Sequence, residues 1–445
     1  MNTTIIGAGL AGLSCSYHLG HDKCLIFEKN TYTGGHIFSH FHNGYVWDEG
    51  PHVSFTENEY VQKLFYDSVN GELNEFECNV SNWYQDSWIP HPAQSNLYAI
   101  PEPLRSKCLK DFLKSRNQPI TNNDILNYGD WLKNAFGKTF ADTFPATYTE
   151  KYWTSNPSNL TTDWIGKRVF NPDIETVKKG FYKPAEKSTH YIKKVRYPKE
   201  GGYVSFAKNF KQNSNVLNNH QVEQFDLKER KVFFTNGTVH NYERLINTLP
   251  LNAFIGLCNS CPEEILNAAK NLACTSLLLV NVTAEHESMT PYHWMYVYDK
   301  NKYSTRINQV NLLSECNTPY GKIGIQVEVY LSRGSLSNVQ KEIISKKVIQ
   351  ELIEMKLIKK AESVHTQFIP YANVIFDHNR RENLNYILEW LTQFGLERED
   401  DDLEPTTTWS SKKNVKIGRL ALAGRYGQWN YYWSDDCVLR GSILS

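Results

Sequence analysis

The sequence predicts an α/β protein in which both ends of the chain contribute strands to one parallel sheet. A short apolar run that ends at Ile6 precedes a glycine-rich turn and a helical stretch. A second apolar run, Cys24–Phe27, follows that stretch, and a third, Leu420–Ala423, lies near the C-terminus and leads into Gly424. Buried strands of parallel sheets have this short, continuous apolar character.

The first turn carries a G-x-G-x-x-G motif formed by Gly7, Gly9 and Gly12. Gly7 allows a tight turn, Gly9 removes a side chain that would block a pyrophosphate, and Gly12 lets helix and strand pack closely. The helical stretch Leu13–Leu19 then offers free N–H groups and the positive end of its dipole to phosphates. The motif therefore predicts a Rossmann-like, dinucleotide-binding unit.

Two further features favour this interpretation over a strand, turn and helix with accidental glycines. Glu28 ends the second strand, in the window expected for a ribose-binding carboxylate, and Gly34-Gly35 follows shortly after it. The predicted cofactor-binding residues in this region are Gly7, Gly9, Leu10, Ala11, Gly12, Glu28, Lys29, Gly34, Gly35 and His36.

The composition argues against several classes of partner. The 48 basic and 48 acidic residues give a formal net charge of zero, without a basic stripe for nucleic acid or an anionic membrane. Because no apolar run is long enough to span a bilayer and the N-terminus starts on a strand, we expect neither a membrane span nor a signal peptide. The nine scattered cysteines indicate a reducing, cytoplasmic location. The oligomeric state is not predicted.

Two groups of potential metal ligands occur, and we expect no metal at either. Cys258 and Cys261 form a C-x-x-C without a second pair at zinc spacing, which favours structural thiols over redox or metal chemistry. His36, His40 and His42 follow the Gly-Gly turn without an acidic or cysteine partner at ligand spacing.

The middle of the chain combines helices with a second set of strands. Asn236-Gly237 predicts a type I′ turn within a hairpin region, Val216–Thr248. The other expected elements are helices at 58–70, over most of 104–144 and at 338–355, a strand pair at 83–92, strands at 277–282, 294–297 and 323–331, and a polar loop at 397–414.

These elements predict three regions. Residues 1–80, 195–255 and 405–445 would form a discontinuous Rossmann-like domain. Residues 81–194 would form a mainly helical cap on the substrate side, and residues 256–404 a substrate-binding sheet.

Several motifs in the same order along the chain together carry a family resemblance. They are GAGLAG at 7–12, GG at 34–35, GPHV at 50–53, WIPHPAQSNL at 88–97, YTEKYWTSNPSNLTTDWIGKRV at 148–169, YPKEGG at 197–202, INTLPL at 246–251, HWMY at 293–296, STR at 304–306, FDH at 376–378 and GRYGQWNYYW at 424–433. The sequence resembles the FAD-dependent amine-oxidase and protoporphyrinogen-oxidase superfamily, which has the GR2-type flavoprotein fold. Within it, the sequence is most similar to the UDP-galactopyranose mutases, especially the eukaryotic type.

The resemblance implies a flavoenzyme that uses reduced FAD. In the mutase family, flavin N5 attacks the anomeric carbon of a nucleotide-diphospho-sugar, and the resulting flavin–sugar adduct lets the sugar ring open and reclose between pyranose and furanose forms. The reaction serves polysaccharide biosynthesis and involves no net redox change, although NAD(P)H is a candidate electron donor for reducing the flavin.

The resemblance also implies roles for individual residues. Arg168 and Arg306 match the arginine pair that binds the substrate diphosphate, for which a planar guanidinium is well suited. His52 matches a histidine at the flavin ring. The implied substrate-binding residues are Gln94, Trp153, Tyr296, Tyr371 and Tyr431, and the further implied cofactor-binding residues are Val222, Gly424, Arg425 and Trp429.

The chain departs from the mutase pattern at three points. Pro51 replaces a glycine before the histidine, and Ala93 replaces a phenylalanine that stacks on uracil. Either another residue, such as Trp153 or Phe181, stacks on the uracil, or the nucleotide is not UDP. Little chain follows Gly441, where the family has its C-terminal helix.

These departures keep two other hypotheses open. One is an oxidoreductase of the same fold, which would oxidise an amine or an alicyclic C–H bond by hydride transfer to FAD. The other is a non-catalytic scaffold, against which the intact glycine motif and Glu28 argue.

Overall fold

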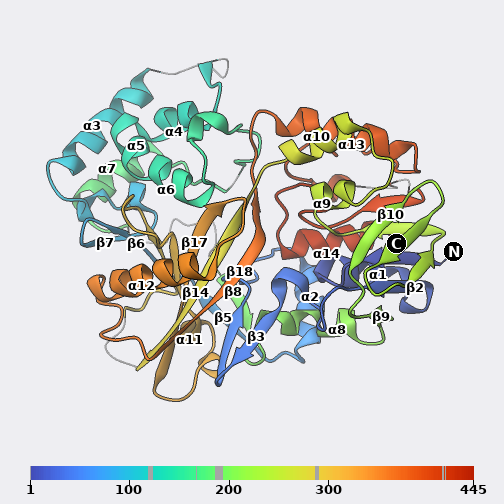
Figure 1. The fold of residues 1–445 in the computed structure, drawn as a ribbon. Helices are drawn as coiled ribbons and strands as arrows, with labels where there is room; N and C mark the ends of the chain where they lie inside the picture. The colour runs from blue at the N-terminus through green and yellow to red at the C-terminus, as the bar shows by residue number, and fades with distance from the viewer. Residues whose placement is uncertain are drawn as a thin grey trace.

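The structure of the protein, a computed structural model, describes residues 2–118, 124–166, 168–185, 194–285, 290–412, 415 and 417–445. A five-stranded parallel sheet and a seven-stranded mixed sheet lie on opposite sides of the molecule, and a group of helices lies beyond one end of the mixed sheet (Figure 1). This arrangement confirms the predicted α/β fold with a Rossmann-like sheet and a second mixed sheet. In the described part of the chain, no helix combines the length and apolar character that a bilayer crossing requires.

The parallel sheet joins the two ends of the chain, as predicted. Ile5 pairs with Ile26 on one side and with Ile246 on the other, and Ile246 pairs in turn with Ala421. All four of these residues are buried, which explains the short apolar runs. In spatial order the strands are β19 (Leu420–Leu422), β13 (Arg244–Asn247), β1 (Thr3–Ile6), β2 (Cys24–Phe27) and β9 (Val216–Leu217).

A C-terminal helix, α14 (Ser434–Ile443), packs on α1 (Leu10–Leu19), the helix that follows the glycine motif. The two helices approach so closely that a Cβ on Gly441 would lie 2.3 Å from the Ser14 hydroxyl. The expectation that the C-terminal helix is nearly absent is therefore wrong. The helix already begins at Ser434, and Gly441 belongs to its contact face.

A three-stranded antiparallel sheet, β10 (Val222–Asp226), β11 (Lys231–Phe234) and β12 (Val239–Asn241), follows the hairpin pattern of the sequence. Asn236-Gly237 lies in the β11–β12 turn, but the turn is not type I′. Only Gly237 has a positive φ, of 83°, whereas a type I′ turn needs positive φ at both central residues. The Gly237 N–H instead donates to the Phe234 carbonyl, so the glycine closes a longer turn.

The mixed sheet contains the predicted strands and also recruits the hairpin from residues 80–90. Its order is β18 (Ser363–Val374), β14 (Cys274–Glu285), β17 (Lys322–Ser332), β16 (Arg306–Gln309), β15 (Trp294–Val297), β6 (Val80–Tyr84) and β7 (Ser87–Pro90). Only β6 and β15 pair in parallel; the other neighbours are antiparallel. Helix α12 (Asn338–Glu354) packs on this sheet through Ile344, Val348 and Leu352.

The remaining helices form two groups (Figure 1). The first group lies beyond the mixed sheet and contains α3 (Leu104–Asn117), α4 (Tyr128–Phe136), α5 (Lys138–Thr143), α6 (Pro145–Tyr152) and α7 (Ile174–Tyr182). The second lies on the side of the parallel sheet and contains α9 (Leu251–Gly256), α10 (Glu263–Asn271) and α13 (Arg380–Thr392). Outside these two groups lie α2 (Glu59–Ser68), α8 (Lys208–Lys211) and α11 (Val310–Leu313), and the strand pairs β3 (Ser39–His42) with β4 (Tyr45–Asp48) and β5 (Leu73–Glu77) with β8 (Lys194–Pro198).

Candidate functional site

A cavity of about 1080 Å³ runs from the glycine motif to the first helical group. We call the part at the glycine motif the dinucleotide end and the part at α6 the ligand end. The predicted site residues that line the cavity are Gly7, Gly9, Leu10, Ala11, Glu28, Lys29, Gly34, Gly35, His36, His52, Gln94, Trp153, Arg168, Val222, Tyr296, Arg306, Tyr371, Gly424, Arg425 and Tyr431. Gly12 and Trp429 lie outside this lining.

The dinucleotide end is a backbone cradle that side chains would fill. Gly7 has φ +99°, and a Cβ on it would lie 2.3 Å from the Thr248 hydroxyl. A Cβ on Gly35 would lie 2.9 Å from the Cα of Gly9. Gly12 lies behind the cradle, where a Cβ would meet the Gly7 carbonyl at 2.0 Å, so this glycine serves the contact between helix and turn. The cradle therefore fits the close approach of a pyrophosphate.

Glu28 fastens this cradle from the end of β2. Its Oε2 accepts a hydrogen bond from the Ala8 N–H at 2.8 Å, and its Oε1 accepts one from the Asn30 N–H at 2.9 Å. The side chain is 6% exposed but borders the cavity. Since each carboxylate oxygen can accept a second bond, Glu28 still has capacity for a ligand hydroxyl.

The ligand end has a cationic stack at its centre. The Cζ of Arg168 lies 4.4 Å from the centroid of the Tyr431 ring, and the Cζ of Arg425 lies 5.0 Å from it. Arg168 also lies 4.6 Å from the Trp433 ring and donates to the Tyr431 carbonyl at 3.0 Å. The buried Nε of Arg425 has no hydrogen-bond partner among the described residues. Such a group fits a site that receives an anionic or carbonyl-bearing ligand.

Arg306 lies opposite an acid that the sequence analysis missed. Arg306 on β16 and Glu328 on β17 are register partners, and the guanidinium holds both carboxylate oxygens, with Nη2–Oε1 at 2.9 Å. The Tyr330 hydroxyl donates to the same carboxylate at 3.1 Å. Burial alone would lower the pKa of Arg306, but Glu328 holds it well above its usual value. A single acid inside the apolar strand 323–331 was the available signal, since a buried acid needs a partner.

His52 enters the cavity as a neutral imidazole. Its Nδ1 lies 2.8 Å from the Gly50 carbonyl, which can only accept, so Nδ1 carries the hydrogen and Nε2 has the free lone pair. Burial lowers the pKa of His52 to about 4. A Cβ on Gly50 would lie 4.0 Å from His52 and 3.6 Å from Glu328, so this glycine separates the two side chains. The Pro51 departure therefore leaves the histidine beside the cavity.

Glu49 lies between two of the histidines that follow the Gly-Gly turn. His40 Nε2 is 3.0 Å from one carboxylate oxygen, and His36 Nδ1 is 3.5 Å from the other. Burial by itself would raise the pKa of the Glu49 carboxyl. The two imidazoles have the larger, opposite effect and lower this pKa to about 2. The sequence analysis gave these histidines no acidic partner, which is wrong because the β3–β4 pairing brings Glu49 back to them.

The outer part of the ligand end is aromatic. Trp153 borders it, whereas Phe181 does not and packs instead against the guanidinium of Arg105 at 5.0 Å. Gln94 is held by a bond from its Nε2 to the Phe170 carbonyl at 2.9 Å. Ala93 is fully buried outside the lining. Aromatic lining residues that the sequence analysis did not select are Tyr128, Phe136, Phe140, Tyr148, Tyr152, Trp164, Tyr298 and Tyr330.

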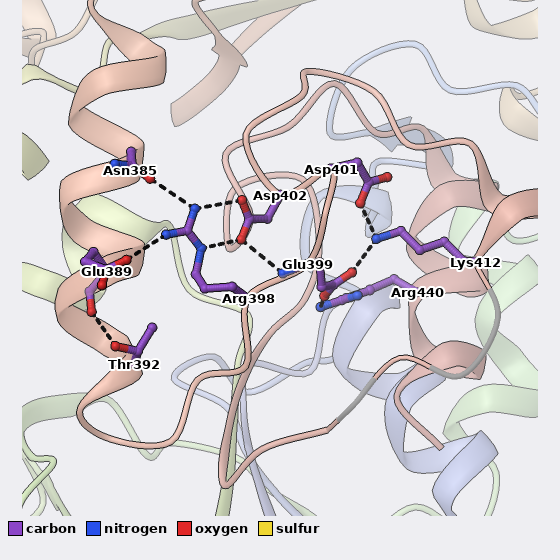
Figure 2. A network of polar contacts seen from close by, with 9 residues as sticks. All are labelled: Asn385, Glu389, Thr392, Arg398, Glu399, Asp401, Asp402, Lys412 and Arg440. Carbon is purple, nitrogen blue, oxygen red and sulfur yellow. Dashed lines mark hydrogen bonds and ion pairs between the residues drawn. The ribbon is translucent and has the colours of Figure 1, made fainter.

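Ion pairs anchor the polar loop 397–412, which precedes Tyr431 in the chain; Figure 2 shows these ion pairs. Arg398 binds Asp402 of the loop and Glu389 of α13. Arg440 of α14 binds Glu399 at 2.6 Å, and Glu399 and Asp401 both bind Lys412. Ion pairs thus fix the predicted loop to two helices.

Hydrogen bonds connect the anchored loop and α13 to the segment that forms the Tyr431 wall of the cavity. The Tyr431 N–H donates to the Pro405 carbonyl at 2.7 Å. Trp429 is fully buried at the turn before this wall, and its carbonyl accepts two bonds from Arg380, at 3.0 and 2.7 Å. Trp429 therefore lies in the packing behind the cavity.

Neither cysteine of the C-x-x-C pair lines the cavity. Burial raises the pKa of the Cys258 thiol, and it raises that of Cys261 to about 11. Cys258 Sγ donates to the Phe254 carbonyl at 3.3 Å. Both thiols are thus held in the protonated, unreactive form.

These features define a dinucleotide-binding α/β protein whose cofactor cavity continues into a cationic, aromatic ligand end. Residues 5–68 match the family model of an NAD(P)-binding Rossmann-like domain. Among solved structures, the chain is similar to reduced UDP-galactopyranose mutase, with 21% identity, a TM-score of 0.87, and coverage of 99% of this chain and 94% of that chain. The family resemblance of the sequence is therefore confirmed at the level of the fold.

Two further solved structures have the same fold. A protein from Exiguobacterium sp. 255-15 described as a protoporphyrinogen oxidase is 13% identical, with a TM-score of 0.69 over 100% of this chain and 97% of that chain. A putrescine oxidase variant is 12% identical, with a TM-score of 0.58 over 99% of this chain and 97% of that chain.

Proposed function

We propose that the protein binds FAD and acts as a UDP-galactopyranose mutase-like isomerase on a nucleotide-diphospho-sugar. FAD fits the dinucleotide end because the glycine cradle leaves room for a pyrophosphate and Glu28 can accept a ribose hydroxyl. Reduced flavin supplies the nucleophile for the sugar, so that no protein nucleophile is required. NAD(P)H is the proposed source of the reducing electrons.

One observation carries the choice of substrate: Arg168 and Arg306 border the ligand end of the same cavity that contains the dinucleotide cradle. With Arg425, they place three guanidinium groups close enough to act electrostatically on the Tyr431 phenol. A diphosphate that leaves and returns during the reaction needs fixed cationic donors, which guanidinium groups provide. Tyr296 and Tyr431 would add hydroxyl donors to the same diphosphate.

The protein's own groups would perform three tasks in this reaction. His52 would accept a hydrogen bond through Nε2 from a donor on the bound cofactor, because it remains neutral at physiological pH. The arginine pair would hold the detached nucleotide in place. Trp153 and Gln94 would contact the base, and the surrounding aromatic residues would exclude water.

We also propose the regional and cellular assignments that go with this function. Residues 1–80, 195–255 and 405–445 would form the cofactor domain, 81–194 the helical cap, and 256–404 the substrate sheet. All nine cysteines are free thiols, which fits a reducing, cytoplasmic setting.

A second candidate is an oxidoreductase that oxidises its substrate by hydride transfer to FAD. The Arg306–Glu328 pair favours the oxidoreductase. The buried Glu328 carboxylate offsets the charge of Arg306, which is one of the two arginines proposed to bind the diphosphate. The many aromatic side chains at the ligand end would also suit an uncharged substrate.

The test is an absorbance spectrum of the purified protein before and after anaerobic dithionite, with a panel of nucleotide-sugars. A yellow protein whose reduced spectrum shifts with one nucleotide-sugar, and which isomerises that sugar without consuming reductant, supports the mutase proposal. Flavin bleaching by an amine, with peroxide formed in air, supports the oxidoreductase. A colourless protein that takes up no FAD contradicts both.

A further inference from the structure

The loop formed by residues 298–305 joins β15 to β16 and thereby connects Tyr296 to Arg306. These two residues are register partners on the adjacent strands, and both border the ligand end of the cavity. β15 and β16 are only four residues long, and the loop directly joins the strand ends at which these two side chains lie.

Lys151 holds this loop from the side of the helical group. It lies on α6, and its Nζ donates to the carbonyls of Val297, Asp299 and Ser304 at 3.0, 2.9 and 2.7 Å. An ammonium group has three N–H donors, so the last residue of β15 takes one of them and the loop takes the other two. The same helix presents Tyr148 and Tyr152 to the cavity, and Lys151 thus ties two walls of the ligand end together.

Glu351, from a different helix, holds the same loop. It lies on α12, is 6% exposed, and accepts bonds from the Tyr303 N–H at 2.7 Å and the Ser304 N–H at 2.9 Å. The Ser304 hydroxyl adds a third bond at 2.6 Å. Carbonyl groups at this connection therefore bind a cation from α6, and N–H groups of the loop bind an anion from α12.

The charges around Lys151 set the pH range in which it can hold three carbonyls. Glu351 faces it from α12, while Asp299 and Lys302 face it from the loop. Burial is the largest influence and lowers the pKa of Lys151 to about 8. Above that pH the amine has only two N–H groups for three carbonyls, so one carbonyl loses its donor.

We propose that Lys151 and Glu351 are positioning residues that clamp the 298–305 loop and so hold Tyr296 and Arg306 in place for a nucleoside diphosphate. The inference rests on the proposed function for its ligand, but the clamp itself is a property of the protein alone. The clamp has two measurable consequences: slow hydrogen exchange of the loop amides and tight nucleotide binding. Both depend on the charge of Lys151, which does not line the cavity.

The test combines hydrogen exchange with UDP binding for the wild type, Lys151→Met, Lys151→Arg and Glu351→Gln. Lys300→Met is the matched control, because Lys300 lies on the same loop but forms an exposed ion pair with Glu150, with side chains 66% and 38% exposed. We expect Lys151→Met and Glu351→Gln to raise loop exchange at least about tenfold and to weaken UDP binding about tenfold. Lys151→Arg should recover part of both effects, and Lys300→Met should change neither.

A pH series on the wild type separates positioning from stability without any mutation. UDP binding and loop protection should both weaken above pH 8. Global stability should respond to Lys151 in the opposite direction, because the unfolded chain keeps the proton up to about pH 10.5 and the folded state therefore gains stability from pH 8 upward. Normal loop protection in Lys151→Met, or unchanged exchange at pH 9, overturns the clamp. A wild type with a protected loop that does not bind UDP contradicts the proposed substrate instead and leaves the clamp supported by exchange.

Discussion

Replacing Glu328 by alanine should destabilise the protein by leaving the Arg306 charge without its partner. The Glu328 side chain is 2% exposed and receives two bonds from Arg306 and one from Tyr330. Breaking a buried pair typically costs about 3–5 kcal/mol. Since Arg306 is 22% exposed towards the cavity, water can partly solvate it, and we expect about 3 kcal/mol.

Urea unfolding of the ligand-free protein measures this effect, with the double variant Glu328→Ala, Arg306→Met as the control. The double variant removes both charges and should be more stable than Glu328→Ala alone. UDP should stabilise Glu328→Ala more than it stabilises the wild type, because the diphosphate would replace the missing carboxylate at Arg306. A loss of less than about 1 kcal/mol in the single variant would refute the argument that this pair is structurally required.

Three further predictions concern the rest of the cavity. Gly12→Ala should lower the free energy of unfolding by about 1–3 kcal/mol and release most of the bound FAD, which the flavin-to-protein absorbance ratio measures. The control is Gly256→Ala, where a Cβ meets nothing within 4 Å, and it should change neither the stability nor the flavin content. The protein should lose stability as pH falls from 6.5 towards about 4, because unfolded His52 takes up a proton before the folded residue does; His52→Phe should reduce this loss in urea titrations. Arg168→Lys should weaken UDP binding about tenfold, since lysine cannot stack on the aromatic rings, and equal affinity in calorimetry would contradict that role.

Much of the fold was predictable because its signals are local. The G-x-G-x-x-G motif, its helix and the acid at Glu28 lie within one short stretch of chain. The strands β6, β7, β14, β15 and β17 of the mixed sheet were visible as apolar or aromatic runs, whereas β16 and β18, which carry more polar residues, were not predicted. The Asn236-Gly237 turn type was wrong because the chain uses a longer connection, in which only the glycine needs positive φ. The C-terminal helix was missed because the resemblance placed it after Gly441, whereas that glycine lies inside its contact with α1.

The sequence by itself determined the Rossmann-like unit and the kinds of residue that its cofactor requires. Only the tertiary structure decided the partners at the ligand end. Register across β16 and β17 pairs Arg306 with Glu328, and the segment before α14 brings Tyr431 to both Arg168 and Arg425. The reason is physical: backbone turns and helix ends follow from neighbouring residues, whereas a buried charge is stabilised by whichever group the long-range packing brings to it.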